Sequence, residues 1–457
     1  MNIGGNKAAE MLAGDIARDI LGMGRTYTPR VNMGNLDKTF FEQNIIRANM
    51  NDSTPATIAS HKRIKGAYYK IQHFIDDSLN SKSTYMEKVE LLCNLYDTFA
   101  KKFKVMSIST TDLEEAFVFF ETLNARGKDL ETSDLLKNHL FKNCTSKLST
   151  IEKKWDNMID ALDGNEPTKY IRTFWNSKYD HIREKQLYKE IRSKINSAVI
   201  CMNFTDDLVE YAPYYRVLVN PQTNSNEFQN NEIINVLEDL KTLKAKTFYP
   251  LVLAMIERKF TEDDILITLK AIATVVFRNF TICRENPSSF ERTYSGLAHK
   301  VFNQEIKTAD ELREELNSLT VEDETFEASF KYESITASVA RFILCKIENN
   351  QRCETQMLKN NNKIHIEHIM PQSKTHWSQI DDDTHKKYLN TIGNLTLLGS
   401  KLNVEASNKT FVEKRDSYYS QSEITITKSL CDYDDWNSSQ IIHRAEELLD
   451  EAEKFWN

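Results

Sequence analysis

Four of the ten histidines lie within one window of 21 residues: His365, His368, His376 and His385. Glu367 directly precedes His368. An imidazole group titrates near neutral pH and is a common metal ligand. A neighbouring carboxylate adds the oxygen ligand that hard divalent cations prefer. The window therefore predicts metal-assisted or proton-transfer chemistry, with Glu367 and His368 at its centre and the other three histidines outside the site.

Two asparagines downstream complete a spaced pattern. Glu367-His368-Ile369-Met370-Pro371 is followed by Asn394-Leu395, and Asn403 comes nine residues after Asn394. This order and spacing resemble the HNH nuclease motif. The resemblance implies that His368 is the general base and that Asn394 orients its ring. It also implies that Glu367 and Asn403 bind a metal ion.

The residue types suit the hydrolysis of a phosphodiester bond. A neutral imidazole near its pKa can take a proton from the attacking water. Mg²⁺ or Mn²⁺ would relieve charge on the phosphate, and a carboxylate and an amide can supply oxygen ligands for such an ion. The seven cysteines are scattered without a C-x-x-C pair, so no zinc site is expected. An HNH-type endonuclease of the zinc-free branch is the predicted enzyme.

The geometry of these residues raises two questions. Adjacent residues of a regular strand point to opposite faces, so Glu367 and His368 can share one ion only where the strand ends or twists. The proline after the strand is compatible with such an end. The T-x-x-E capping box over 410–413 would start a helix after Asn403, which makes Asn408 the alternative metal ligand.

The rest of the chain has the composition and periodicity of helices. Glycine and proline together account for 20 of the 457 residues, which leaves few helix breaks. Apolar residues recur at helical spacing in 36–104, 231–283, 308–319 and 333–349, whereas 364–369 alternates as a strand. The expected fold is mainly α, a helical body with a small C-terminal ββα-metal module of the HNH-like type.

The charge distribution bears on the substrate. A formal net charge of −8 excludes a globally basic nucleic-acid binder but leaves room for local basic surfaces. Residues 136–196 hold 13 Lys and Arg against 8 Asp and Glu, with interleaved aromatics. They form either amphipathic helices with core aromatics or a surface that follows a phosphate backbone. Nearer the histidines, Lys409 and Lys414 are the predicted phosphate contacts.

The sequence shows neither a membrane segment nor a secretory signal. No run approaches 18 apolar residues, and the N-terminus lacks a basic start followed by an apolar block. A cytoplasmic protein with reduced thiols and no membrane partner is therefore expected.

Two longer stretches resemble a known family. The run IHIEHIMPQ…YLNTIGNLTLLGSKLNVEASNKTFVEKRDSYYSQS, residues 364–422, is similar to the C-terminal nuclease domain of GmrSD-type restriction enzymes. Residues 120–138 resemble a piece of that family's ParB-like N-terminal domain. The family consists of modification-dependent restriction endonucleases, so the resemblance implies cleavage of foreign or modified DNA in anti-phage defence. It also implies three regions: a ParB-like helical remainder over 1–145, a helical middle over 146–350 and an HNH-like nuclease domain over 351–457.

One family motif does not occur in this sequence. Members carry an Asp-Gly-Gln-Gln-Arg string tied to nucleotide hydrolysis, and this chain has none. A start assigned too late, a truncation, or a separate NTPase-bearing partner chain would each explain this. The chain alone is not expected to use a nucleotide, and the alternative function is a non-catalytic DNA-binding or regulatory subunit. Asn124, Arg126 and Gly127 form either a structural turn or part of an incomplete nucleotide pocket.

Overall fold

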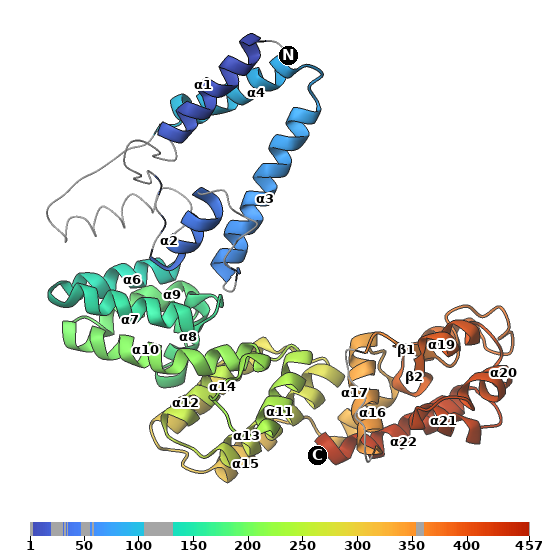
Figure 1. Cartoon of the computed structure of the whole chain (residues 1–457). Helices are drawn as coiled ribbons and strands as arrows, with labels where there is room; N and C mark the ends of the chain where they lie inside the picture. The colour runs from blue at the N-terminus through green and yellow to red at the C-terminus, as the bar shows by residue number, and fades with distance from the viewer. Residues whose placement is uncertain are drawn as a thin grey trace. The chain divides into compact units, whose positions relative to one another are not determined.

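The computed structural model describes residues 3–19, 31, 33, 35–46, 55–56, 59–104, 131–352 and 361–456. Contacts along the chain define two compact units, Met1–Pro167 with Ile191–Val209, and Thr168–Glu190 with Glu210–Asn457. Helices dominate the described part of both units, and one two-stranded sheet lies in the second unit (Figure 1). The predicted fold class, mainly α with a small C-terminal β element, is confirmed.

The described elements of the first unit are all helical. Its helices are α1 (Ile3–Asp19), α2 (Asn35–Phe41), α3 (Ala59–Asn80), α4 (Tyr85–Asp97), α6 (Thr132–Asn143) and α7 (Leu148–Ala161), with shorter turns at η1 (Glu42–Ile46), η3 (Thr98–Lys102) and η4 (Thr145–Lys147). Parts of α9 (Glu184–Lys194) and α10 (Ala198–Val219) also belong to this unit. The predictions for Asn124, Arg126 and Gly127 fall outside the described residues.

The second unit holds the remaining elements. Its helical body comprises α8 (Pro167–Lys178), η5 (Pro221–Thr223), α11 (Asn231–Thr242), α12 (Tyr249–Glu257), α13 (Glu262–Val275), η6 (Val276–Ile282), α14 (Ser288–Phe302), α15 (Ala309–Asn317), α16 (Asp323–Tyr332) and α17 (Ala337–Asn350). The C-terminal part comprises β1 (Ile364–His368), α18 (Asp382–Tyr388), η7 (Ile392–Asn394), β2 (Leu395–Gly399), α19 (Ser400–Ala406), α20 (Phe411–Lys414), η8 (Arg415–Tyr419), α21 (Thr425–Lys428), η9 (Ser429–Asp432) and α22 (Ser438–Trp456).

The first of the two helical patterns within 231–283, residues 232–259, forms two helices, α11 and α12. Lys244 adopts a φ of 61°, and the N–H of Ala245 donates to the carbonyl of Leu240 at 2.9 Å. This left-handed residue with a six-to-one bond is a common way to end a helix. Pro250 then sits in the first turn of α12, where its missing N–H costs no hydrogen bond.

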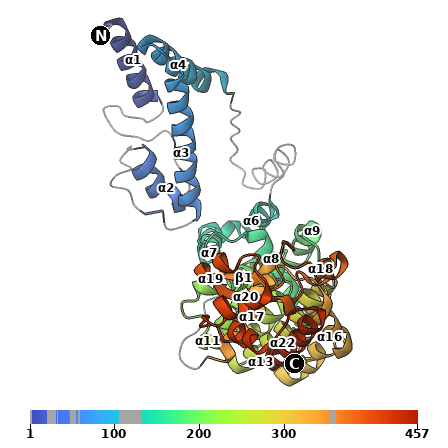
Figure 2. The same ribbon diagram turned by 90° about the vertical axis from the view of Figure 1, so that its right-hand side faces the viewer.

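Helix α13, continued by η6, runs through the core of the second unit. The stretch Glu262–Ile282 is long and apolar enough to cross a membrane, but 72% of its most apolar window is buried inside the protein. Burial of this kind is expected for the central helix of a bundle that is apolar nearly all round. Figure 2 shows the end of α22 near α13 and α16, with which it packs.

Aromatic residues of the basic stretch 136–196 form core. Trp155, Tyr170, Phe174 and Trp175 are all at most 3% exposed. The expectation that these aromatics are core residues is therefore confirmed for these four. Whether the lysines around them follow a phosphate backbone stays a prediction.

The hairpin β1–β2 lies between two apolar cores. Ile364, Ile366, Leu395 and Leu397 pack into a core built mainly from η6, α16, α17 and α22. On the other side, Leu398 belongs to a second core with Met370, Trp377, Tyr419 and Trp436. Figure 1 shows the hairpin between α17 and α19, both of which it contacts. This double burial holds the end of β1, where the predicted catalytic residues lie.

Candidate active site

The antiparallel register of the hairpin places Glu367 and His368 on opposite faces. Glu367 pairs with Thr396, and His368 pairs with Leu395. Cross-strand partners share a face, and consecutive residues alternate between faces. Glu367 therefore lies on the face toward Lys414 of α20 and Tyr419 of η8, whereas His368 lies at the edge of the face that covers the helical body. The strand ends directly after this pair, at His368.

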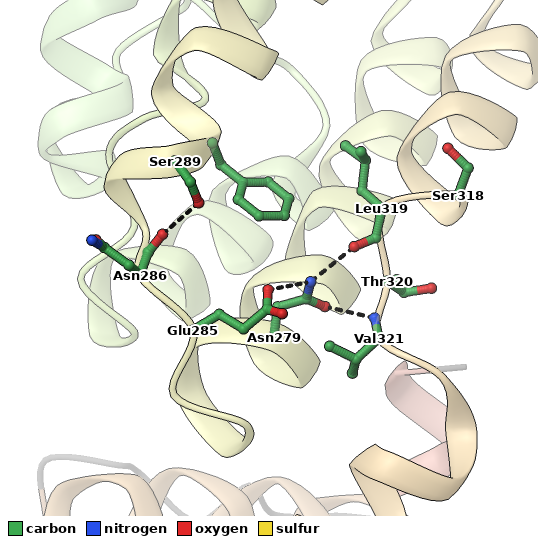
Figure 3. A pocket seen from close by; sticks show the side chains of 9 residues that line it. Asn279, Glu285, Asn286, Ser289, Ser318, Leu319, Thr320 and Val321 are labelled. Atoms are coloured by element: carbon green, nitrogen blue, oxygen red, sulfur yellow. Dashed lines mark hydrogen bonds between the residues drawn. The ribbon is translucent and has the colours of Figure 1, made fainter.

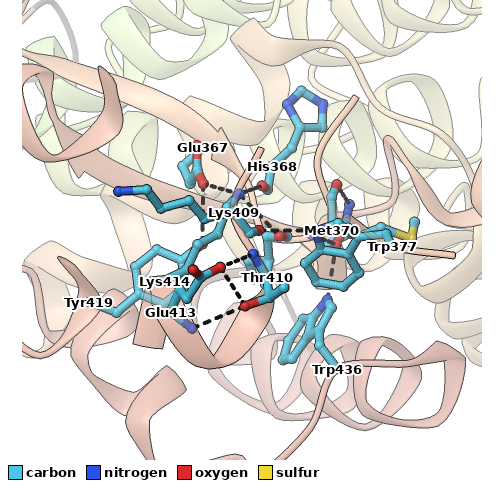
Figure 4. Close-up of polar contacts among 12 residues, drawn as sticks. Glu367, His368, Met370, Trp377, Lys409, Thr410, Glu413, Lys414, Tyr419 and Trp436 are labelled. Atoms are coloured by element: carbon cyan, nitrogen blue, oxygen red, sulfur yellow. Dashed lines mark hydrogen bonds and ion pairs between the residues drawn. The ribbon is translucent and has the colours of Figure 1, made fainter. Parts of the chain in front are cut away.

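The contacts of Lys414 mark the point where β1 ends (Figure 4). Its Nζ donates to the carbonyl of His368 at 2.9 Å and to the carbonyl of Ile369 at 3.2 Å. In a regular strand, consecutive carbonyls point in opposite directions, so one ammonium group cannot bind both. The backbone therefore turns between His368 and Ile369. The regular strand therefore ends directly after Glu367 and His368.

Asn394 clamps the same turn from the other side. Its Oδ1 accepts from the N–H of Met370 at 2.8 Å, and its Nδ2 donates to the carbonyls of Met370 and Leu389, each at 3.0 Å. The indole N–H of Trp436 also donates to Oδ1, at 3.1 Å. The side chain of Asn394 is fully buried and engaged mainly with the backbone. It holds the segment after His368, and its described partners are backbone groups and the Trp436 indole instead of the imidazole ring.

Glu367 accepts a hydrogen bond from the same Lys414 Nζ at 2.6 Å and another from the Tyr419 hydroxyl at 3.2 Å (Figure 4). A capping box at Thr410 starts α20 just before Lys414, as predicted from the sequence. The helix then continues as the π-helical segment η8, with Ser420 N–H donating to the Arg415 carbonyl five residues back. A π-turn brings residues five apart to the same side, so Lys414 and Tyr419 both reach Glu367.

The electrostatics of this cluster follow from its burial. Glu367 is 6% exposed, and Lys414 and Tyr419 are 0% exposed. Burial raises the pKa of the Glu367 carboxyl, while Lys414 acts in the opposite direction. Burial also lowers the pKa of the Lys414 ammonium and raises the pKa of Tyr419 well above its usual value. Tyr419 therefore stays a phenol that donates its proton to Glu367, and Lys414 offers no exposed ammonium for the phosphate contact predicted from the sequence.

Glu367 and Asn403 each present an oxygen that could bind a cation. Both hydrogen bonds to Glu367 end on Oε1, so among the described contacts Oε2 is the oxygen left for a further ligand. Asn403 lies in α19, and its Oδ1 is buried without a hydrogen-bond partner among the described residues. A buried acceptor of this kind calls for a water or an ion. Asn408, the alternative ligand, lies between α19 and α20 beside Ser407, whose φ is 42°.

A cation here would depend on a mixed set of oxygen ligands. Across residues 3–104 and 131–456, as far as they are described, no three His, Cys, Asp or Glu side chains gather to hold a metal ion. One carboxylate and one amide oxygen leave most of the coordination shell to water and phosphate, which suits Mg²⁺. The residues present therefore fit a hard, partly hydrated divalent cation.

The other histidines of the window have separate partners. His365 is exposed, and its Nε2 lies 2.9 Å from the Ser400 hydroxyl. His385 in α18 bonds the Pro371 carbonyl through Nε2 at 2.8 Å, which further holds the turn after β1. His376 is exposed in the connection before α18. The predicted phosphate contact Lys409 donates to the Tyr418 hydroxyl and lies 4.4 Å from the centre of that ring.

Helix α22 closes the site from behind. Arg444 donates from Nη1 to the carbonyls of Gly393 and Leu395, at 2.8 and 2.7 Å. Burial lowers the pKa of this guanidinium to about 10, so it keeps its charge at neutral pH. A Cβ on Gly393 would lie 2.0 Å from the Ile441 carbonyl oxygen, so only glycine allows this close contact. The turn Gly393-Asn394-Leu395 therefore packs directly against α22.

A separate hollow of about 580 Å³ lies beside η6, the start of α14 and the connection between α15 and α16 (Figure 3). The Asn279 amide in its wall bonds Glu285, the Leu319 carbonyl and the Val321 N–H. The hydroxyls of Ser289 and Thr320 donate to backbone carbonyls of their own turns. Because these polar groups already have partners, the lining gives no sign of a ligand.

Two protein-family models match the chain. "GmrSD restriction endonucleases, C-terminal domain" matches residues 320–451, and "GmrSD restriction endonuclease, N-terminal domain" matches residues 28–141. Together they cover 246 of the 457 residues. The chain belongs to the GmrSD restriction endonuclease family. A search of curated proteins found no match.

Membership in this family implies a DNA endonuclease that acts in restriction defence, in agreement with the resemblance in the sequence. A nuclease of this kind suggests a divalent metal. The C-terminal match, 320–451, contains the whole candidate site together with the underlying helices α16 and α17.

Sequence reasoning missed one side chain that touches the predicted base. The Nε2 of His368 lies 3.0 Å from Oδ1 of Asn390, which is 22 residues away in the chain. No spacing rule pointed to Asn390, because only the folded turn brings it beside the ring. Tyr419 and Arg444 were missed for the same reason, since their roles depend on burial against distant segments.

Proposed function

We propose that this protein is a cytoplasmic, Mg²⁺- or Mn²⁺-dependent DNA endonuclease of the HNH type, with His368 as general base. Glu367 and Asn403 are the metal ligands, Asn394 holds the turn that presents His368, and Lys409 is a phosphate contact. The observation that carries the proposal is the turn at His368–Ile369. This turn ends the strand directly after Glu367 and His368, and it supports the proposal that the two side chains serve one site.

In this mechanism, His368 takes the proton from the attacking water through its free ring nitrogen, Nδ1. The bond between the water oxygen and phosphorus forms as the bond to the leaving sugar oxygen breaks. A divalent cation held by Glu367 and Asn403 would neutralise the charge that develops on the phosphate. Lys414 and Tyr419 hold the Glu367 carboxylate through Oε1, which directs Oε2 away from them.

The test compares wild type with His368→Ala on supercoiled plasmid DNA, with Mg²⁺, Mn²⁺ or EDTA and without added nucleotide. Loss of a general base lowers a rate by roughly 10²- to 10⁴-fold, so nicking by the variant should be barely detectable. His365→Ala is the matched control, because His365 lies on the same strand but bonds only the exposed Ser400 hydroxyl in the described contacts.

Equal nicking by wild type and His368→Ala would refute the assignment of the base. Nicking that persists in EDTA would refute the role of the cation. Absence of nicking by the wild type under all conditions would favour the alternative, a subunit that cuts no DNA by itself.

A further inference from the structure

The imidazole of His368 has one hydrogen bond that fixes its plane. Nε2 lies 3.0 Å from Oδ1 of Asn390. An amide oxygen only accepts, so the nitrogen that faces it carries the proton. In the neutral form of a ring held in this way, Nδ1 carries the lone pair that can accept a proton.

The side chain of Asn390 is exposed, but its backbone is held on three sides. The Asn390 carbonyl accepts from the N–H of Ile335 at 2.8 Å, and the preceding carbonyl, of Leu389, accepts from Asn394 at 3.0 Å. The following residue, Thr391, is fully buried and bonds the Tyr388 carbonyl through its hydroxyl at 2.9 Å. A short side chain on a fixed backbone has little freedom, which is what a positioning group requires.

We propose that Asn390 is the positioning residue of His368: its Oδ1 accepts a hydrogen bond from the Nε2–H group and thereby aims Nδ1 at the attacking water. This inference rests on the proposed function, in which His368 is the base. Asn390 lies outside the Glu-His, Asn-Leu and Asn pattern. Asn394 acts on the same ring through the backbone, because it holds Leu389 on one side and Met370 on the other.

The backbone of Asn390 also connects His368 to the helical body, through the hydrogen bond from the Ile335 N–H. Ile335 lies between α16 and α17, and the carbonyl of the preceding residue, Ser334, accepts from Arg284. The position of the Asn390 backbone, and with it the plane of the imidazole, therefore depends on a loop that precedes the hairpin by about thirty residues in the sequence.

The experiment uses the full chain with ¹³C at Cε1 of its histidines and compares wild type, Asn390→Ala and Asn390→Asp. The His368 signal is identified by its loss in His368→Ala. Without metal, the His368 ring should be rigid in wild type and in Asn390→Asp, which keeps the acceptor, and mobile in Asn390→Ala. With metal and plasmid, Asn390→Ala should lower kcat by about tenfold with an unchanged KM, because a misplaced reacting group costs rate more than binding.

Ser400→Ala is the matched control, since it removes the equivalent partner of His365. It should loosen the His365 ring and leave the His368 ring and kcat unchanged. A His368 ring that stays rigid in Asn390→Ala, or a kcat equal to that of wild type, would overturn the inference. If instead His368→Ala nicks DNA as well as wild type does, the proposed base is wrong, while the ring measurement still decides whether Asn390 holds His368.

Discussion

Two buried carboxylates of the second unit, Glu348 and Glu367, differ in how their oxygens are used. Glu348 in α17 is 0% exposed, and both of its oxygens accept hydrogen bonds. Oε1 accepts from Arg352 at 2.7 Å and from the Thr425 N–H at 3.0 Å, and Oε2 accepts from the Ile426 N–H at 3.0 Å. Glu367 accepts two bonds as well, but both fall on Oε1.

By this comparison, Glu348 is a structural carboxylate, whereas Glu367 has an oxygen that can still bind a ligand. Glu348 satisfies the first N–H groups of α21, which would otherwise be buried without partners. Glu367 is also held by Lys414 and Tyr419, yet its Oε2 has no hydrogen bond among the described residues and remains for another ligand. A buried ion pair contributes little net stability, so the pair of Glu367 and Lys414 agrees better with a role in positioning.

The largest effect on folding is expected for Glu348→Ala. Removal of this carboxylate leaves Arg352 and two backbone N–H groups unpaired, so the free energy of unfolding should fall by about 3–5 kcal/mol. Urea denaturation measures this loss. The control is Glu333→Ala, whose exposed pair with Arg284 is worth about 0–1 kcal/mol. Equal losses of unfolding free energy in the two variants would show that Glu348 is not a structural carboxylate.

A smaller loss of stability but a specific loss of metal binding is expected for Glu367→Gln. The glutamine oxygen can still accept from Lys414 and Tyr419, so unfolding should become easier by only about 1–3 kcal/mol. Its NH₂ group replaces Oε2 and cannot bind a cation. Mg²⁺ or Mn²⁺ should therefore raise the melting temperature of wild type and of folded Glu348→Ala, but leave that of Glu367→Gln unchanged. A metal-induced shift in Glu367→Gln as large as in wild type would show that Oε2 is not a ligand.

The smallest change in stability is expected for Asn403→Ala. The Asn403 Oδ1 has no partner to lose among the described residues, and alanine favours the helix by several tenths of a kcal/mol, so the free energy of unfolding should change by less than about 0.5 kcal/mol. Metal affinity, followed by calorimetry, should fall by roughly tenfold, which is 1.4 kcal/mol. Asn408→Ala tests the alternative ligand in parallel. If Asn408→Ala loses the affinity and Asn403→Ala keeps it, the ligand is Asn408.

Much of the fold could be predicted because it depends on local signals. The alternating isoleucines before Pro371 predicted β1, and the T-x-x-E box at Thr410 predicted the start of α20. The long apolar helix at 262–282 was equally clear. The break between α11 and α12 was missed because it depends on the left-handed conformation of Lys244, which the surrounding apolar pattern conceals.

The site was predictable in its residue types but less so in its contacts. The spacing identified Glu367, His368, Asn394 and Asn403 as candidates, and the structure places the first three around one turn. The spacing in the sequence could not show that Lys414 is buried, because lysine usually lies on the surface and its partner Glu367 is 47 residues away. The same holds for Asn390, which reaches His368 only through the fold.

The residues that hold the hairpin are synthesised in a fixed order. The Glu-His pair is synthesised before the side chains that clamp the turn after it: Lys414 and Tyr419 come later, then Trp436 behind Asn394, then Arg444 behind Gly393 and Leu395. A nascent chain that has exposed the motif therefore still lacks the contacts that turn the strand at His368. The assembled arrangement can form only after α22 has left the ribosome, so a growing chain would carry the motif without yet having the geometry to cut DNA.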